Sequence, residues 1–199
     1  MIKLNRKTKE TEINLELELY GNGQSRIETG LGFFDHMLEL WSRHGFFDLN
    51  LTVMGDLEVD AHHTVEDTGI LMGKALNQEL GERTGIQRYG DVILPMDETL
   101  MMIALDLGGR SYYEDNFNLD KKIINNISLE VFPEFFKAFS DNAKMNLHFK
   151  LLRNNNNHHL LEACFKGLGR TLDQALQVDE RLNDTPLSTK GNLGEEGEE

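Results

Sequence analysis

The amino-acid sequence predicts an α/β fold, an α+β sandwich in which sheets pack on a layer of helices. Two similar βαβ-type modules, produced by an internal duplication, are expected to make up this fold. Segments with a hydrophobic period of two alternate with segments of helical period, in the same order in both halves of the chain. Residues 49–67 also align without a gap with residues 145–163, at a shift of 96 positions.

The first half contains two strand-like segments and two helical ones. Apolar residues alternate with polar ones over 13–19 and 49–53, which predicts strands. Between them, apolar side chains recur at helical spacing over 34–41, and Gly45 stands where a C-cap glycine would end the helix. A second helix follows the paired histidines and is expected to end at Gly81.

The second half repeats this order. We expect strands over 92–94, 100–106 and 145–151, and helices over 135–139 and 161–176. The half-modules are therefore placed at residues 1–90 and 91–190. Residues 191–199 contain four glutamates and one apolar side chain, so they cannot offset the entropy of ordering and are expected to form an acidic disordered tail.

Composition excludes several classes of protein. Twenty Lys and Arg residues against 34 Asp and Glu residues give a formal net charge of -14, which argues against a nucleic-acid partner. The longest apolar run, residues 100–105, is far shorter than the ~18 residues of a membrane-spanning helix. The N-terminus has no apolar leader, and the single Cys164 fits a reducing compartment. We expect a cytoplasmic protein with no membrane partner.

Two HHxxE clusters provide the strongest functional signal. They coincide under the 96-residue shift and consist of His62, His63 and Glu66 in the first half and His158, His159 and Glu162 in the second. Residues three and four apart share one face of a helix, whereas neighbours diverge by about 100°. The glutamate can therefore join only one of its two histidines. Two clusters can supply two ions, each with ligands from both copies.

The ligand types restrict the metal without identifying it. Imidazole nitrogen together with carboxylate oxygen suits Mn, Fe, Co, Ni or Zn. The absence of cysteine from the clusters argues against a structural zinc site, and HHxxE differs from the HExxH of zinc proteases. His36 and His148 lie outside the repeat; adding them gives two ions three histidines and one carboxylate each. His44 is instead expected to be a C-terminal helix residue that interacts favourably with the dipole.

These residues leave three classes of function open. The first is a metal-dependent enzyme whose reaction is not a hydrolysis. The second is a dinuclear metal phosphohydrolase, in which a metal-bound water attacks phosphate. The third is a non-catalytic metal-binding assembly protein, which would take up metal without turnover.

Five segments resemble the imidazoleglycerol-phosphate dehydratase family. They are GFFDHML at 32–38, DAHHTVED at 60–67, LDLGGR at 105–110, HHLLEA at 158–163 and STKG at 188–191, and the resemblance extends from about residue 9 to 191. It implies a lyase that dehydrates D-erythro-imidazoleglycerol phosphate to imidazole acetol phosphate in histidine biosynthesis. It also implies a homo-oligomer of 24 subunits with sites between subunits. The sequence has neither room nor a motif for the phosphatase domain that is fused to the dehydratase in some organisms, so we expect a monofunctional chain.

The same resemblance implies two Mn ions per site. Their ligands would be the residues that match the family's, namely His36, His62, His63, Glu66, His148, His158, His159 and Glu162. The substrate has no carbonyl beside the reacting hydrogen, so its imidazole ring must store the electrons. We expect an imidazolate bound to two ions to expel the neighbouring hydroxyl through a diazafulvene-like intermediate, after which a carboxylate removes a C–H proton. Glu10, Glu66 and Glu162 are the candidate catalytic carboxylates.

Phosphate binding requires local cations, because the chain as a whole repels an anion. The positions that match the family's phosphate and substrate contacts are Arg88, Arg110, Lys166, Ser188 and Lys190. Two departures from the family pattern stand out. Leu40 replaces a usual glutamine, so one polar substrate contact is expected to be missing or supplied elsewhere, and residues 154–157 form an asparagine run in place of a loop that often contains glycine.

Overall fold

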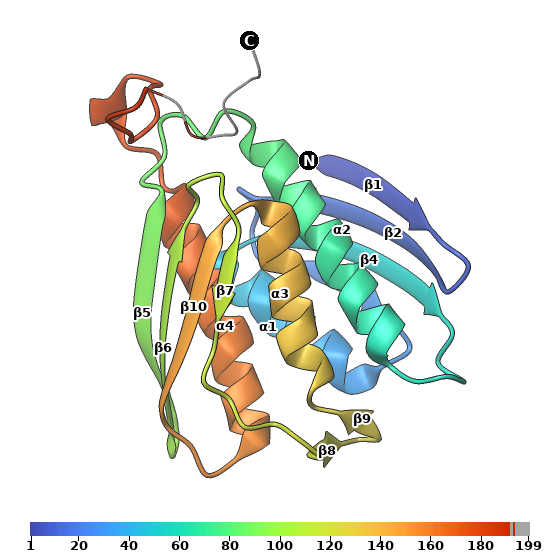
Figure 1. Ribbon diagram of the computed structural model, residues 1–199. Coiled ribbons are helices and arrows are strands. Elements are labelled where there is room, and N and C mark those ends of the chain that lie inside the picture. Colours follow the sequence, from blue (N-terminus) through green and yellow to red (C-terminus); the bar gives the residue numbers. More distant parts are fainter. Residues whose placement is uncertain (192, 194–199) are drawn as a thin grey trace.

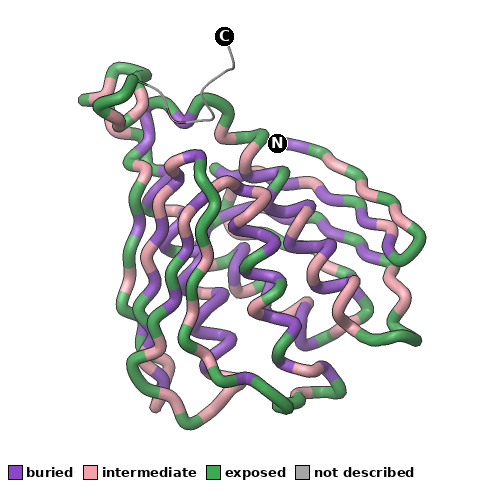
Figure 2. The backbone as a smooth tube through the Cα atoms, in the orientation of Figure 1, coloured by how far each residue is buried: buried purple, intermediate pink, exposed green. Residues whose placement is uncertain are grey.

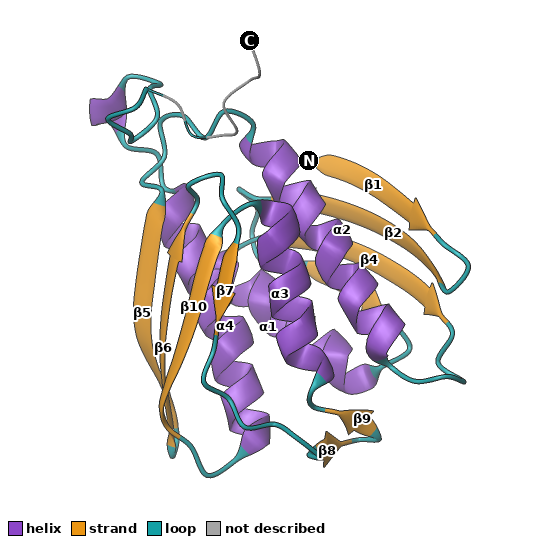
Figure 3. Cartoon of the chain, in the orientation of Figure 1, coloured by secondary structure: helices purple, strands orange, loops and turns teal. Residues whose placement is uncertain are grey.

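A computed structural model describes residues 1–191 and 193 and arranges them in four layers (Figure 1). Two four-stranded sheets face each other, and four long helices fill the space between them, as the colouring by secondary structure makes clear (Figure 3). The expected α/β class is confirmed, with the helices enclosed by both sheets. Buried residues follow the helices and the inner faces of the strands (Figure 2).

The first half forms one sheet and two helices. Its elements are β1 (Ile2–Lys7), β2 (Thr11–Glu18), β3 (Ser25–Glu28), α1 (Gly32–Gly45), β4 (Asp48–Gly55) and α2 (His62–Leu80). The strand order is β1-β2-β4-β3, in which β3 runs parallel to β4 and the other pairs are antiparallel.

The second half has the same topology. Its main elements are β5 (Tyr89–Met96), β6 (Thr99–Asp106), β7 (Tyr112–Glu114), α3 (Val131–Ala143), β10 (Asn146–Arg153) and α4 (Asn157–Leu176). The order β5-β6-β10-β7, with β7 parallel to β10, reproduces the order of the first sheet. A small hairpin of β8 (Ile123–Ile124) and β9 (Ile127–Ser128) and a 3-10 turn (Glu180–Leu182) are additions to this half.

Three strands of the two four-stranded sheets were not predicted, and their sequences explain why. The strands β1, β3 and β7 all lie at sheet edges, where one side of the strand faces solvent. The four residues of β3 include no fully buried side chain, and β7 is similarly exposed. A period of two is recognisable only where alternate side chains enter the core, so these strands lack the pattern.

The end of α1 also differs from the expectation. Gly45 is the last helical residue, and Phe46 adopts the left-handed conformation of the cap, with φ of 57°. Gly45 is required for a different reason, since a Cβ there would lie 2.1 Å from the ring of Phe47. Gly81 does follow α2 with a positive φ of 49°, as predicted.

Helices from opposite halves pack against each other at equivalent glycines. The pairs are α2 with α3 and α4 with α1. A Cβ on Gly73 of α2 would lie 2.5 Å from the carbonyl oxygen of Phe139, and one on Gly169 of α4 would lie 2.5 Å from that of Trp41. Gly73 and Gly169 coincide under the 96-residue shift. The duplication has therefore kept the one residue type that lets two helix backbones approach this closely.

Two buried charged groups join elements that are distant in sequence. Asp67 of α2 accepts hydrogen bonds from Arg6 Nη2 (2.7 Å) and from the hydroxyl of Thr11, so it ties the β1–β2 hairpin to the helix. Arg83 is 5% exposed and donates to Asn77 Oδ1 (2.6 Å) and to the carbonyl oxygen of Ala143 (3.0 Å) at the end of α3. A cation is favourable there because helix C-termini carry partial negative charge.

The expected acidic tail lies, except for Gly191 and Leu193, outside the described residues. Within the described part of the chain, no helix is both long and apolar enough to cross a membrane.

The close helix contact gives a stability prediction. Replacing Gly73 with Ala should lower the free energy of unfolding by on the order of 1–3 kcal/mol, because the added methyl group meets the backbone of α3 and outweighs the gain in helix propensity. Gly32→Ala is the matched control, since nothing lies within 4 Å of a Cβ at the first residue of α1. Urea unfolding of both variants should give a loss for Gly73→Ala only; an equal or greater stability for Gly73→Ala would contradict the packing argument.

Candidate metal centre

One of the two HHxxE clusters forms a set of three potential ligands with a residue of the other half. His158 Nε2 lies 3.0 Å from Glu162 Oε1 on α4, and His36 Nε2 of α1 lies 3.4 Å from the same oxygen. The ligand atoms of these three residues all lie within 4.8 Å of one another. Packing of α1 on α4 therefore brings together residues that are more than 120 positions apart in the sequence.

The asparagine run sets the start of α4. The side chain of Asn156 is the N-cap and accepts hydrogen bonds from the backbone N–H groups of His158 (2.9 Å) and His159 (3.5 Å). Asn156 is in turn held by Asn154, whose side-chain oxygen accepts its N–H at 3.0 Å. An asparagine cap satisfies N–H groups that have no partner within the helix. The run thus fixes the two histidines in the first turn.

The other HHxxE cluster begins α2 in a more open setting. His62 Nε2 lies 3.4 Å from Glu66 Oε2, and both side chains are 42% exposed. The α3 residue that corresponds to His36 under the 96-residue shift is the buried Phe132, which provides no ligand atom. His62 instead lines a pocket of about 470 Å³ whose acidic members are Asp115, Asp120, Glu130 and Glu134.

In both clusters the glutamate faces the histidine four residues before it, and the second histidine turns away. The ring planes of His62 and His63 lie at 85°, and those of His158 and His159 at 86°. His63 Nδ1 lies 3.0 Å from Asp56 Oδ2, and His159 Nδ1 lies 3.0 Å from Glu98 Oε1. Each cluster therefore presents imidazoles in two directions, as helix geometry requires.

The carboxylates beside the second histidines act on their ionisation. The hydrogen bond with Asp56 raises the pKa of His63. The pKa of Glu98 is lowered, mainly by a hydrogen bond from its own backbone N–H and in part by His159.

His148 is not brought to either cluster. It lies on β10 between the inward-facing Leu147 and Phe149, so its side chain is on the outer face of the second sheet. There its ring centroid is 5.2 Å from that of Tyr112, and its Nδ1 is 3.8 Å from Glu114 Oε2. A single chain thus distributes the eight expected ligands over separate surfaces.

Lys166 contacts the expected ligand Glu162. Its Nζ lies 2.6 Å from Glu162 Oε2, one helical turn further along α4. Burial pushes the pKa of Glu162 upward, but Lys166 and, to a smaller extent, His36 and His158 outweigh this effect and lower the pKa to about 2. Glu162 is therefore ionised at neutral pH.

The other expected cations occupy a second region. Arg88 binds Asp106 through two bonds, Nε to Oδ1 at 2.6 Å and Nη2 to Oδ2 at 2.9 Å, and its Nη1 donates to the carbonyl oxygen of Leu187 at 2.7 Å. Leu187 precedes Ser188, whose hydroxyl oxygen accepts the N–H of Lys190 at 3.1 Å. Arg88 thus holds the segment that carries Ser188 and Lys190.

Arg110 is exposed, and its carbonyl oxygen accepts a hydrogen bond from Asn146 of β10 at 2.7 Å. Leu40 packs against the hydrophobic core, so that position offers no polar contact.

His44 does lie in the last turn of α1, but burial and the nearby Lys166 and Arg170 lower its pKa. The charged form that would favour the helix dipole is therefore disfavoured.

Glu10 is exposed in the loop between β1 and β2, and its Oε1 lies 3.8 Å from His63 Nε2.

Asp56 and Glu98 were not predicted from the sequence as residues of the site. Glu98 had a signal in the sequence, because Glu98-Thr99 matches Glu10-Thr11 at a shift of 88 positions. That offset differs from the 96 of the helices, so the single shift used for the HHxxE clusters does not reveal it.

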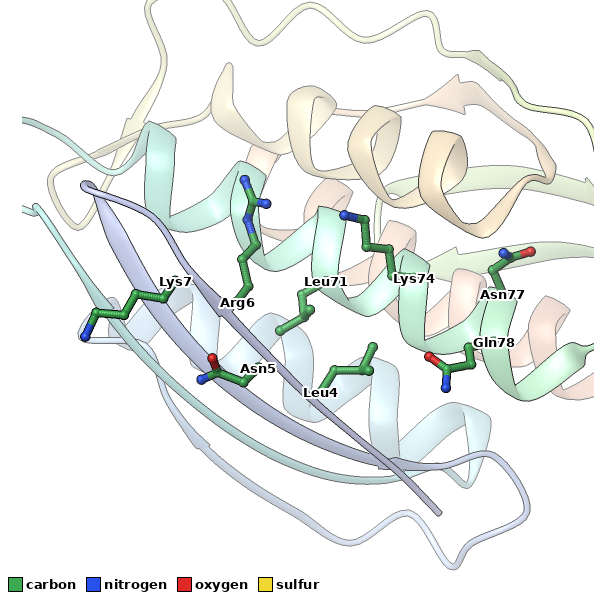
Figure 4. A pocket seen from close by; sticks show the side chains of 8 residues that line it. All are labelled: Leu4, Asn5, Arg6, Lys7, Leu71, Lys74, Asn77 and Gln78. Atoms are coloured by element: carbon green, nitrogen blue, oxygen red, sulfur yellow. The ribbon is translucent and has the colours of Figure 1, made fainter.

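A further pocket of about 520 Å³ lies between the edge strand β1 and α2 (Figure 4). It is lined by Leu4, Asn5, Arg6, Lys7, Leu71, Lys74, Asn77 and Gln78. None of these is an expected ligand, and Arg6 and Lys7 are already paired with Asp67 and Glu12. The pocket is therefore not part of the candidate centre.

Comparisons with known proteins agree with these features. A family model described as imidazoleglycerol-phosphate dehydratase matches residues 29–172. Proteins of that name from Lachnoclostridium phytofermentans and Acetivibrio thermocellus are 52% and 49% identical over 191 residues, which is 96% of this chain and 97% of each relative.

Solved structures give the same result. The crystal structure of imidazoleglycerol-phosphate dehydratase from Staphylococcus aureus matches with a TM-score of 0.80 and 35% identity, over 89% of this chain and 98% of that one. The Pyrococcus furiosus structure, in complex with (S)-C348, matches with a TM-score of 0.80 and 34% identity, over 94% and 99%.

The low pKa of Glu162 predicts how acid affects the metal-free protein. A carboxyl whose pKa is lower in the folded state than in the unfolded state stabilises the fold above its ordinary pKa of 4.5, and this contribution is lost as the pH falls toward about 2. Glu162→Gln should therefore lose less stability than the parent when urea midpoints are compared between about pH 5 and pH 2.5.

The matched control for this prediction is Glu66→Gln. It makes the same chemical change at the equivalent position of α2, where Ile70 stands in place of Lys166. This control should keep the acid dependence of the parent. Parallel curves for the parent and Glu162→Gln would show that the contact with Lys166 does not lower the pKa of Glu162.

Proposed function

The chain belongs to the imidazoleglycerol-phosphate dehydratase family and is a hydro-lyase of histidine biosynthesis, and we propose that it is a metal-dependent enzyme acting on D-erythro-imidazoleglycerol phosphate. The product would be imidazole acetol phosphate. The observation that carries the metal dependence is the pair of HHxxE clusters, each with its glutamate within 3.4 Å of a histidine, one of them joined by His36.

The donor set fits divalent transition-metal ions. His36, His158 and Glu162 place imidazole nitrogens and an ionised carboxylate within 4.8 Å of one another, and His62 with Glu66 repeats part of this arrangement. Imidazole and carboxylate together suit Mn and its neighbours in the series. We propose two Mn ions per site, held by the eight ligands named from the sequence.

The distribution of these ligands supports sites shared between subunits. Each of three places carries only part of the set. They are the group of His36, His158 and Glu162 between α1 and α4 (the α1–α4 cluster), the start of α2, and the outer face of the second sheet. Around His148 that face exposes the apolar Met102 and Ile93, which are paired in register on β6 and β5. Apolar residues exposed together are a feature of protein interfaces. We propose a homo-oligomer, and we keep the 24 subunits implied by the family resemblance as part of the proposal.

The chemistry divides between the metal ions and the protein. Divalent ions held by the eight proposed ligands would supply positive charge that favours the imidazolate form of the substrate, and this electron-rich ring would promote loss of the adjacent hydroxyl. Glu10 is exposed and lies on the Nε2 side of His63, so we assign it the removal of the neighbouring C–H proton. Glu66 and Glu162 are the proposed carboxylate ligands of the metal ions.

The phosphate group would bind at the second region of cations. Arg88 holds the segment that carries Ser188 and Lys190, so these three positions are close in the chain's fold. Arg110 and Lys166 complete the proposed set, and Lys166, which lies beside Glu162 on α4, would join it across a contact between subunits. Charge-assisted hydrogen bonds of this kind offset the repulsion expected from a net charge of -14.

We also propose a cytoplasmic location. The single Cys164, which is buried and free, fits the reducing conditions of that compartment.

One assay separates dehydration from the two alternative functions. Mn-loaded protein is incubated with the substrate, and the enolisable ketone and inorganic phosphate are both measured. A dehydratase forms the ketone and keeps the phosphate ester, a phosphohydrolase releases phosphate, and a metal-binding assembly protein forms neither product. Absence of the ketone after Mn loading would contradict the proposal.

Glu162→Gln should lower the Mn content and the dehydratase activity together, because one ligand to the proposed ions is lost. Metal analysis of the purified variant and a ketone assay test this directly. A variant that retains full activity would remove Glu162 from the ligand set.

Arg110→Ala should lower kcat/KM by roughly 10- to 100-fold, the cost of losing a hydrogen bond to a charged group, while the Mn content stays that of the parent. Arg26→Ala is the control, because Arg26 is an exposed arginine of β3 that pairs with Glu28. An Arg110→Ala variant that has lost its Mn would indicate a structural role instead.

A further inference from the structure

The two β-hairpins that begin the halves carry equivalent glutamates in different environments. Glu10 precedes β2 and Glu98 precedes β6, and both are followed by a buried threonine. Each hairpin approaches the second histidine of the HHxxE cluster in its own half. Glu98 lies 3.0 Å from His159 Nδ1, whereas Glu10 lies 3.8 Å from His63 Nε2. The equivalent residues therefore face opposite nitrogens of equivalent imidazoles.

Asp56 explains this difference. It follows β4 directly, and its carboxylate lies 3.0 Å and 3.2 Å from His63 Nδ1. Its backbone N–H donates to the carbonyl oxygen of Glu10 at 3.1 Å, so the two loops are joined. Asp56 thus takes the place at His63 that Glu98 takes at His159, and Glu10 is left on the other side of the ring.

An ionised carboxylate only accepts hydrogen bonds, so the Nδ1 that faces it must carry the hydrogen. In a neutral imidazole the hydrogen-free nitrogen is then Nε2, which is the one available to a metal ion. Carboxylate partners of this kind orient metal-binding histidines in other proteins.

We propose that Glu98 and Asp56 are positioning residues that hold His159 and His63 with Nε2 directed toward the proposed metal ions. The inference rests on the proposed function, and it adds two residues to the site. It also assigns the hairpin glutamates different tasks: Glu98 orients a ligand, while Glu10 is free to exchange a proton with the substrate.

Asp97 provides a matched comparison for Glu98. It is the preceding residue in the same loop, and its Oδ2 lies 3.9 Å from His159 Nδ1, beyond hydrogen-bond distance. It is 75% exposed, against 31% for Glu98. Asp97, Glu98 and His159 could also hold an ion themselves, since their ligand atoms lie within 4.8 Å of one another. If Glu98 orients His159, removal of Asp97 leaves the affinity for Mn unchanged. If the three residues bind an ion directly, removal of Asp97 weakens it.

The test measures Mn affinity by titration of the metal-free full chain. Glu98→Ala and Asp56→Ala should each weaken the binding of Mn by about 10- to 100-fold, the usual effect of removing such a partner. Glu98→Gln, which keeps a neutral acceptor, should fall between Glu98→Ala and the parent. The controls Asp97→Ala and Glu58→Ala remove exposed carboxylates from the same two loops and should bind Mn as the parent does.

A second measurement separates positioning from folding. The urea midpoint of each metal-free variant should match that of its control, because the lost hydrogen bond is partly exposed. If Glu98→Ala does not fold, Glu98→Gln provides the same comparison against Asp97→Ala.

Three results would overturn the inference. A parent that binds no Mn would contradict the proposed function and this inference together. A parent that binds Mn, with Glu98→Ala binding it equally well, would contradict this inference alone. An equal loss of affinity in Asp97→Ala and Glu98→Ala would mean that the loop carboxylates bind an ion directly.

Discussion

The close approach of α4 to α1 at Gly169 is the contact on which the α1–α4 cluster depends. Without a side chain at this position, the backbone of α4 lies against that of α1 near Trp41 and Gly45. His36 of α1 then lies near His158 and Glu162 of α4, and one potential metal site contains residues of both halves. The corresponding Gly73 brings α2 against α3 in the same way. The cluster is therefore a consequence of how the halves pack, and neither half contains it alone.

The two halves share the strand order of their sheets but differ in the residues around their HHxxE clusters. The two sheets have the same strand order, and the two HHxxE clusters have the same internal geometry. Around them, however, each half has different neighbours. Phe132 stands where the first half has His36, and Ile70 stands where the second has Lys166. Such divergence would let two similar clusters serve the proposed substrate, which is asymmetric and carries a ring at one end and a phosphate at the other.

The sequence was sufficient for the parts of the molecule whose pattern is local. The four long helices and the central strands β2, β4, β6 and β10 were predicted because their side chains enter the core at a regular period. The edge strands β1, β3 and β7 bury too few side chains to show it. The pairing of each glutamate with the histidine four residues earlier also follows from local geometry. Asp56 and Glu98 could not be found in this way, because their contacts with His63 and His159 depend on tertiary structure.

A metal ion that binds in the α1–α4 cluster would compete with Lys166 for the carboxylate of Glu162. Because the pKa of Glu162 is about 2, its carboxylate carries no proton at neutral pH, and an arriving cation displaces none. The cation must instead displace the Lys166 ammonium, which lies 2.6 Å from Glu162 Oε2, or share that oxygen with it. The ammonium remains charged when it leaves this contact, so it can be solvated or bind an anion. The same lysine is one of the proposed phosphate contacts. Metal binding at Glu162 would thus leave a cation free beside the site, and the substrate's phosphate is the group in the proposed reaction that needs one.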